Sequence, residues 1–311
     1  MRGMTLSRGG GERAVLALVL VAAALPVSQA LRSALRRWRR RDVDIVVKFG
    51  GSAITTKTSF ETVDAAALAE AAAAVAAGGR CVVVHGAGSF GHFQAREHGV
   101  SAGAADERFS WRGFALTRAS VCKLNGLVVD ALLEAGVAAV GVPPCTAFGA
   151  TRGRGVVPIA SRRRGLGRVR ELLVRAGPVV PVLHGDAVLD DVQGASILSG
   201  DTLVEVLAAH LRPGLVVFLT DVAGVYDRPP CEPGATLIPR LEVGRDGSMR
   251  IPETTAASHD VTGGIRGKLD SAAAIAKDGT PVVVVQVGTP HARVALRGDV
   301  PDVCTVIERA A

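Results

Sequence analysis

The sequence predicts an α/β protein, a three-layer αβα sandwich with a mainly parallel central sheet. From residue 42 onward, short valine-rich runs alternate with longer runs rich in alanine and leucine, and strands that alternate with helices imply a parallel sheet covered on both faces. Aromatic residues make up only 4% of the 311 residues. This composition suits buried strands under closely packed helices rather than a surface on which bases stack. We therefore expect no nucleic-acid partner.

Six apolar runs are expected to form the buried strands of this sheet, and four longer segments are expected to form helices. The strands are predicted at 43–49, 80–85, 138–142, 179–183, 215–220 and 281–287. The helices are predicted at 60–77, 111–135, 202–210 and 268–278. Residues 227–259 form the least regular stretch, an excursion on the surface with a hairpin over 240–250 around Asp246-Gly247. Ligands should bind beyond the carboxyl ends of the strands.

Residues 1–41 are predicted to be a leader outside the fold, and residues 42–311 a single domain. The leader holds nine of the 36 basic residues and one of the 29 acidic ones, so its net charge is +8 while the rest of the chain carries −1. Its apolar run, 14–27, is short for a membrane span. A small-residue cleavage pattern and an arginine-rich stretch follow. This order favours a secretory route or delivery to a plastid or other organelle, with a cytoplasmic location as the alternative, and no stable membrane insertion of the mature body.

The five cysteines are widely separated and odd in number, and no C-x-x-C pair occurs among them. This pattern indicates neither a disulfide framework nor a zinc site. We expect reduced and mostly buried thiols.

Five motifs place glycines and charged residues at the ends of predicted strands or the starts of helices. Glycine lets the backbone approach a ligand and turn its amides toward an anion, and a nearby lysine adds positive charge. Two such turns after two strands of one sheet suggest a donor phosphate and an acceptor in one crevice. The motifs are Lys48-Phe-Gly-Gly-Ser52, His85-Gly-Ala-Gly-Ser-Phe-Gly-His92, the pair His184-Gly-Asp186 and Ser199-Gly-Asp201, Thr220-Asp-Val-Ala-Gly-Val-Tyr-Asp227, and Thr262-Gly-Gly-Ile-Arg-Gly-Lys268.

Each motif alone also has an ordinary structural explanation. The first is no Walker A loop and fits a simple tight turn. Asp186 and Asp201 could be turn or N-cap residues, and His92 could bond the backbone at a helix N-terminus. Lys268 could be a solvated helix charge.

In their order and spacing the motifs resemble the amino acid kinase family over residues 43–307. The run from His85 to Gly99 and the run from Leu116 to Asn125 are similar to isopentenyl phosphate kinases within it. This resemblance implies ATP-dependent phosphorylation of isopentenyl phosphate to isopentenyl diphosphate, which feeds isoprenoid biosynthesis. It also implies ATP and Mg²⁺ as cofactors, a homodimer, and dimethylallyl phosphate as a second acceptor.

The resemblance also assigns roles to residues. Lys57 would stabilise the transition state, and Asp201 would orient Lys48 and Lys268. No residue is assigned as a dedicated metal ligand. Acceptor-binding residues are Ala87, His92 and Gly185, and the catalytic set is Lys48, Lys57, His92, Asp201 and Lys268. The ATP-binding residues are Lys48, Gly50, Gly51, Ser52, Gly88, Asp221, Tyr226, Gly264 and Lys268.

These assignments suit the chemistry, because an acceptor phosphate is already anionic and needs no general base. The difficulty is to neutralise charge on the transferring group, and three lysines beside three glycine-rich turns meet that demand. Residues 111–133 are a candidate wall for a prenyl tail, with Phe114, Ala115, Ala119, Val121 and Cys122 spaced along one face, although any one of these could instead be a core residue that faces the sheet. The alternatives are a kinase of this fold for another acceptor, fosfomycin-like or UMP, and a catalytically silent nucleotide-binding member of the fold.

Overall fold

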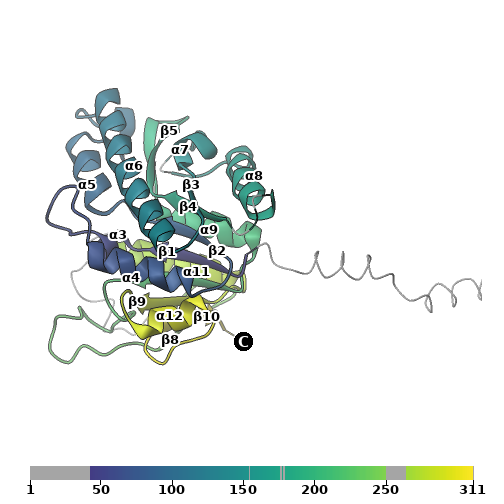
Figure 1. Cartoon of the computed structure of the whole chain (residues 1–311). Coiled ribbons are helices and arrows are strands. Elements are labelled where there is room, and N and C mark those ends of the chain that lie inside the picture. The colour runs from purple at the N-terminus through teal and green to yellow at the C-terminus, as the bar shows by residue number, and fades with distance from the viewer. Residues whose placement is uncertain (1–42, 154, 176, 178, 250–263, 311) are drawn as a thin grey trace, which may run out of the picture. The chain divides into compact units, whose positions relative to one another are not determined.

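The computed structural model describes residues 43–310 except 154, 176, 178 and 250–263. In this part an eight-stranded sheet has the order β3-β4-β2-β1-β7-β9-β10-β8 (Figure 1). All neighbours pair in parallel except β9 and β10, so β10 and its parallel neighbour β8 run against the rest. The strands are β1 (Ile45–Phe49), β2 (Cys81–His85), β3 (Ala139–Gly141), β4 (Val180–His184), β7 (Leu215–Thr220), β8 (Arg240–Val243), β9 (Val282–Gln286) and β10 (Thr305–Arg309).

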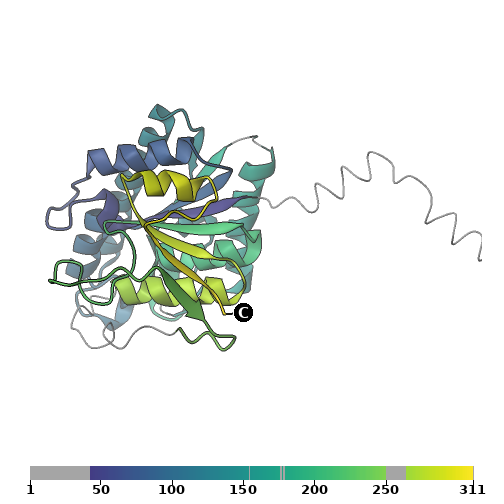
Figure 2. The same cartoon turned by 90° about the horizontal axis from the view of Figure 1, so that it is seen from below.

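Helices cover both faces of this sheet, which makes the three layers that the sequence predicts. One face is covered by α4 (Ala65–Ala76), α6 (Trp111–Glu134) and α12 (Pro290–Leu296). The other is covered by α8 (Ile159–Arg175), α9 (Gly200–Leu211) and α11 (Gly264–Lys277). Figure 2 shows the sheet edge-on between the two layers, with α4 and α12 on one side and α11 on the other. The predicted fold class is confirmed.

Burial of the central strands on both faces explains why they appear in the sequence as continuous apolar runs. Every residue of β1, β2 and β4 is buried. Alternate residues of β1 face opposite layers: Val46 packs in the cluster that contains α9 and α11, while Ile45 and Val47 pack in the cluster that contains α4 and α6. A strand buried on both faces loses the polar alternation of a half-exposed strand.

The six predicted strands are confirmed to within two residues at each end, and three of the four helices to within four. The fourth prediction, a helix from residue 60, is wrong at its start. Asp64 caps α4 by accepting from the Ala67 N–H at 3.0 Å, so residues 60–64 lie in a loop. A serine at position 110 caps α6 in the same way.

Several elements were not predicted. The hairpin after β8 is confirmed by a bridge between Val243 and Met249, although Arg250 lies outside the described residues. The stretch from 227 is nevertheless more than a surface excursion, because β8 extends the main sheet beside β10. The further elements are strand β10, the hairpin β5 (Asp186–Asp190) and β6 (Gly194–Leu198), α3 (Gly51–Ile54), α5 (Gly88–Glu97), the 3₁₀ turn η1 (Gly103–Ala105), α7 (Pro144–Ala147), α8 and α12.

The cysteines agree only in part with the expectation of buried thiols. All five are free, and Cys81 and Cys304 are buried, but Cys231 is exposed. Burial, with the nearby charge of Asp44, raises the pKa of Cys81 to about 12.

Candidate active site

Two glycine-rich turns meet at the carboxyl ends of the neighbouring strands β1 and β2. A Cβ atom on Gly51 would lie 2.6 Å from the Gly88 nitrogen, so the turns pack backbone against backbone. Gly88 also has a φ of +50°, which side chains disfavour. In the described part of the chain, the N–H groups of Ala87 and Gly88 at the start of α5 donate to no protein acceptor. They are therefore free to bind an anion.

Lys48 enters the same crevice from β1. Its side chain is buried, and its ammonium lies 3.0 Å from a carboxylate oxygen of Asp201 in the first turn of α9. The ammonium also lies 5.7 Å from the centre of the Phe218 ring. Ser199 caps α9 by accepting from the Thr202 N–H at 3.0 Å, which fixes the turn that carries Asp201. The structure thus brings Lys48 and Asp201 together as the sequence predicts.

Lys57 projects from a loop that is closed by a bridge between Thr55 and Val63. Its ammonium lies 3.0 Å from one carboxylate oxygen of Asp221, just beyond β7. Ser52 donates to the other oxygen at 3.4 Å. Both charged side chains remain well exposed, so this ion pair can exchange for contacts with a ligand at little cost.

Lys268 lies on the first turns of α11 and belongs to the same charged cluster. Burial and the positive charge of Lys48 together lower its pKa to about 8. Asp201 and Asp221 oppose this shift, and Lys57 adds to it. The three lysines and two aspartates of the cluster carry a net charge of +1, which favours a polyanionic ligand. Gly264 begins α11, whereas Thr262 and Gly263 of its motif lie outside the described residues.

His92 stands one helical turn after Gly88 on α5, near the open side of the crevice. Much of its side chain is exposed, yet neighbouring protein atoms reduce its hydration and lower its pKa. The charges of Arg96 and Lys48 lower that pKa further. The imidazole is therefore neutral at pH 7 and can donate one hydrogen bond to an anion.

Gly185 follows β4 and lies where three elements converge. A Cβ atom at this position would come within 3.3 Å of the Gly200 nitrogen and 3.7 Å of the Ala87 nitrogen. Its own N–H donates to the carbonyl oxygen of His85 at 2.9 Å. The predicted acceptor residues Ala87 and Gly185 are thus brought together.

Tyr226 lies in the loop beyond β7 and has no hydrogen bond to the cluster among the described residues. Its backbone pairs with Leu237 in the loop beyond β7. No contact within the described residues joins its side chain to the lysines or to the glycine-rich turns. Its assignment to ATP binding stays a prediction.

Two histidines at equivalent strand-end positions beside the turns were not among the predicted site residues. His85 and His184 end the adjacent strands β2 and β4, and their rings stack with centres 5.4 Å apart. In each, Nδ1 lies 3.0 Å from the carbonyl oxygen of the following glycine. Burial lowers the pKa of both, that of His85 to about 3, so both are neutral and donate from Nδ1. Asn125 meets His85 Nε2 at 3.1 Å. The repeated His-Gly pair at two strand ends is the signal that could have revealed them.

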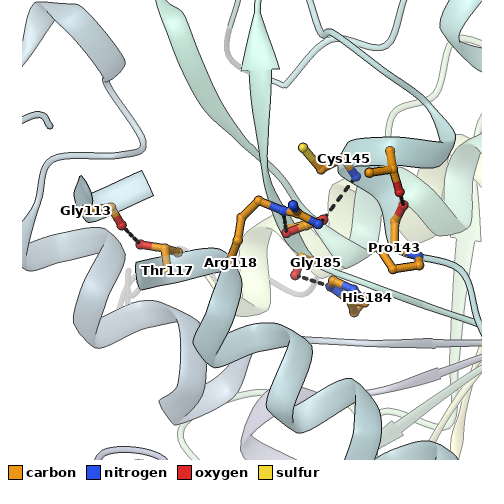
Figure 3. Close-up of polar contacts among 9 residues, drawn as sticks. Gly113, Thr117, Arg118, Pro143, Cys145, His184 and Gly185 are labelled. Atoms are coloured by element: carbon orange, nitrogen blue, oxygen red, sulfur yellow. Dashed lines mark hydrogen bonds and ion pairs between the residues drawn. The ribbon is translucent and has the colours of Figure 1, made fainter. Parts of the chain in front are cut away.

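Arg118 and Asp186 were also missed as a pair. Figure 3 shows Arg118 extending from α6 toward the backbone beside Gly185, with Cys145 approaching from the opposite side. Arg118 Nε and Nη2 lie 3.2 and 3.5 Å from the two carboxylate oxygens of Asp186, and the Cys145 N–H donates to that carboxylate at 3.0 Å. The Asp186 carboxylate is fully buried. The sequence contains no signal that would pair residues so far apart along the chain.

A separate hollow of about 910 Å³ lies between α9 and α11 near the amino ends of the strands. Arg162, Arg212 and Pro281 are among the residues that line it. None of the predicted site residues does, so the glycine-rich crevice is distinct from this hollow.

The fold and this cluster define the class of the protein, and comparison with known proteins agrees. Residues 45–286 match the amino acid kinase family. The chain therefore belongs to the amino acid kinase family. Glutamate 5-kinase of Anaeromyxobacter dehalogenans, at 32% identity over 75% of this chain and 55% of that protein, shows the breadth of this similarity.

The most similar relatives narrow the placement within the family. Isopentenyl phosphate kinase of Arabidopsis thaliana is 44% identical over 234 residues, 71% of this chain and 68% of that protein. Isopentenyl phosphate kinase of Methanothermobacter thermautotrophicus is 35% identical over 79% of this chain and 92% of its own length. A solved structure of isopentenyl phosphate kinase matches with a TM-score of 0.69 and 32% identity, over 85% of this chain and 99% of that one. Within the family, the chain groups with the isopentenyl phosphate kinases.

Proposed function

We propose that the protein transfers the γ-phosphoryl group of ATP to the phosphate of isopentenyl phosphate. The new bond joins an acceptor phosphate oxygen to the γ-phosphorus. The bond between the γ-phosphorus and the oxygen that bridges it to the β-phosphate breaks, and ADP and isopentenyl diphosphate are released. The observation that carries this proposal is the meeting of two glycine-rich turns, on adjacent strands, beside a cluster of three lysines. The kinases named above, at 44% and 35% identity, support the same reaction.

On the donor side, Lys48 and Lys268 bind the phosphates of ATP, and Gly51 and Ser52 supply backbone amides, since the Gly50 N–H already donates to the carbonyl oxygen of Leu219. Lys57 leaves its partner Asp221 and stabilises the negative charge that develops on the transferring group. The acceptor oxygen is anionic at neutral pH, so catalysis depends on position and charge rather than on a general base.

On the acceptor side, the free N–H group of Ala87 binds the phosphate and His92 donates a further hydrogen bond, while the free N–H group of Gly88 is left for ATP. Gly185 bounds the proposed phosphate site, because its backbone lies against Ala87 and a side chain at position 185 would fill the space between them. The acceptor phosphate, a dianion, favours the protonated form of His92 and so opposes the lowering of its pKa.

The residues present fit a Mg²⁺ ion that arrives with ATP. No group of three potential metal ligands occurs in the described part of the chain, and Mg²⁺ in kinases is held mainly by substrate phosphates with one or two carboxylates. Asp221, whose carboxylate pairs with exposed Lys57 and accepts from Ser52, is the carboxylate that would approach it. The ion would neutralise phosphate charge and orient the γ-phosphoryl group.

The prenyl tail is proposed to lie along α6. Phe114, Arg118 and Cys122 fall four residues apart and are all partly exposed, so they form one accessible face. Of the other candidates, Val121 is buried, and Ala115 and Ala119 are exposed on a different side of the helix. The tail wall would therefore be narrower than the sequence alone suggests.

The remaining expectations stay proposals. Across residues 43–310, outside the stated gaps, the helices are all too short or too polar to cross a membrane. We propose a homodimer, which size-exclusion chromatography with light scattering tests. We also propose delivery of the chain by its leader to a plastid or another organelle, which imaging of a C-terminal fluorescent fusion tests.

The reaction is tested by measuring ADP release by the purified protein with ATP and Mg²⁺. Isopentenyl phosphate, dimethylallyl phosphate, UMP and fosfomycin serve as parallel acceptors, and Lys57→Ala, expected to be about 100-fold slower, is the comparison variant. We expect turnover of the two prenyl phosphates alone. Turnover of UMP or fosfomycin in their place would assign a different acceptor, and ATP binding without turnover of any acceptor would support a silent nucleotide-binding protein.

A further inference from the structure

The ion pair between partly exposed Arg118 and fully buried Asp186 lies directly against the acceptor side of the crevice. Asp186 is the residue after Gly185, whose backbone faces the free N–H of Ala87. Its carboxylate accepts from Arg118 on α6 and from the Cys145 N–H on α7. Three elements are therefore tied together at one carboxylate, one residue away from the proposed phosphate site.

Stability alone is a poor explanation for this pair. Removing two charges from water costs so much that a buried ion pair is often no better than well-packed apolar side chains. The geometry instead fixes an orientation, because two guanidinium nitrogens reach the two oxygens of one carboxylate. A lysine in place of Arg118 could offer only a point charge.

The peptide between Gly185 and Asp186 is held from both sides. On one side His184 Nδ1 lies 3.0 Å from the Gly185 carbonyl oxygen. On the other side Arg118 and Cys145 hold the Asp186 side chain (Figure 3). This peptide is thereby prevented from rotating toward or away from the Ala87 N–H.

Arg118 also lies in the middle of the accessible face of α6, between Phe114 and Cys122. Arg118 is therefore part of the wall proposed for the tail and also binds Asp186, the residue after Gly185. A shift of α6 relative to Gly185 would change the distance between these two parts of the acceptor site.

We propose that Arg118 and Asp186 are positioning residues for the acceptor, which hold Gly185 and helix α6 at the separation that isopentenyl phosphate requires. This inference rests on the proposed function. Neither side chain takes part in the chemical step, and neither is expected to affect nucleotide binding, because the donor side is built from β1, α3, β7 and α11.

The test compares steady-state kinetics of the full chain and three variants. In Arg118→Lys the charge remains but the two-nitrogen contact is lost. In the double variant Arg118→Met with Asp186→Leu the pair is replaced by apolar side chains of similar shape, which avoids a stranded charge. Arg293→Gln is the matched control, since it breaks an exposed 2.8 Å contact with Glu70 on the opposite part of the sheet.

For both Arg118→Lys and the double variant, KM for isopentenyl phosphate should rise about 10-fold or more, as expected for the loss of one well-oriented charged contact, while KM for ATP stays within about 2-fold. The control should leave both constants unchanged. Equal changes in the two KM values, or no change, would overturn the inference, and so would unfolding of even Arg118→Lys, which would assign the pair to stability. Failure of the unaltered protein to use isopentenyl phosphate would instead contradict the proposed function.

Discussion

Replacement of Lys268 by methionine tests whether the crevice holds excess positive charge at a cost to stability. The pKa of Lys268 falls from 10.5 to about 8 in the folded protein. At about 1.36 kcal/mol per unit, this shift corresponds to at most about 3 kcal/mol of destabilisation when the lysine is charged. The side chain retains some exposure, and solvent screening reduces the figure to about 1 to 2 kcal/mol.

The sign follows from the direction of the shift. The folded state binds the Lys268 proton more weakly than the unfolded state does, so the cost is fully present below about pH 8. It is relieved as the pH rises from about 8 toward 10.5, because the folded protein loses this proton first. Lys268→Met should therefore be more stable than the unaltered protein at pH 7, and the difference should shrink at higher pH.

The assay is urea unfolding followed by circular dichroism at pH 7 and pH 9.5, without nucleotide. Lys277→Met, at the exposed end of the same helix, controls for loss of a lysine and should change the free energy of unfolding by less than about 0.5 kcal/mol. The reasoning is refuted if Lys268→Met is no more stable at pH 7, or if its gain is the same at both pH values. Lys268→Met should also bind ATP more weakly. The two measurements together separate the contribution of the Lys268 charge to ATP binding from its effect on the free energy of unfolding.

Two further substitutions test the division between donor and acceptor residues. His92→Ala should raise KM for isopentenyl phosphate about 10-fold and leave KM for ATP unchanged, because the imidazole can donate a charge-assisted hydrogen bond to the acceptor alone; an equal loss of ATP affinity, measured in the same steady-state assay, would contradict this. Lys57→Ala should lower kcat about 100-fold with little change in either KM, because its contact strengthens only as charge develops; single-turnover experiments measure that step, and an unchanged rate would remove Lys57 from the mechanism.

The sequence predicts the central buried strands of this fold better than its peripheral helices and its hairpin. The valine runs of β1, β2 and β9 are typical of strands buried on both faces, and the structure has strands there. The hairpin of β5 and β6 was missed because its runs mix polar and apolar residues and are short. Helix α8 was missed because its arginines give it little apolar content, and α5 because Gly88 and Gly91 read as a turn.

The same limit applies to the candidate site. Lys48, Gly51 and Gly88 could be predicted because each stands at the end of a strand in a motif that is visible locally. The contact of Arg118 with Asp186 joins residues 68 positions apart, and the stacking of His85 on His184 depends on the order of strands in the sheet. Such pairs follow from topology, which one sequence does not specify.

The glycine-rich turn proposed to bind ATP follows β1, and the glycine-rich turn proposed to bind the acceptor follows β2. This placement has a mechanical consequence. These strands are hydrogen-bonded neighbours in register, with Lys48 opposite Val84 and Phe49 opposite His85. The gap between the turns is therefore close to the strand spacing of about 4.8 Å, which is among the least compressible distances in a protein. Two mutually repelling substrates can then be held in line by neighbouring strands, and Lys57 can reach the transferring group by leaving Asp221.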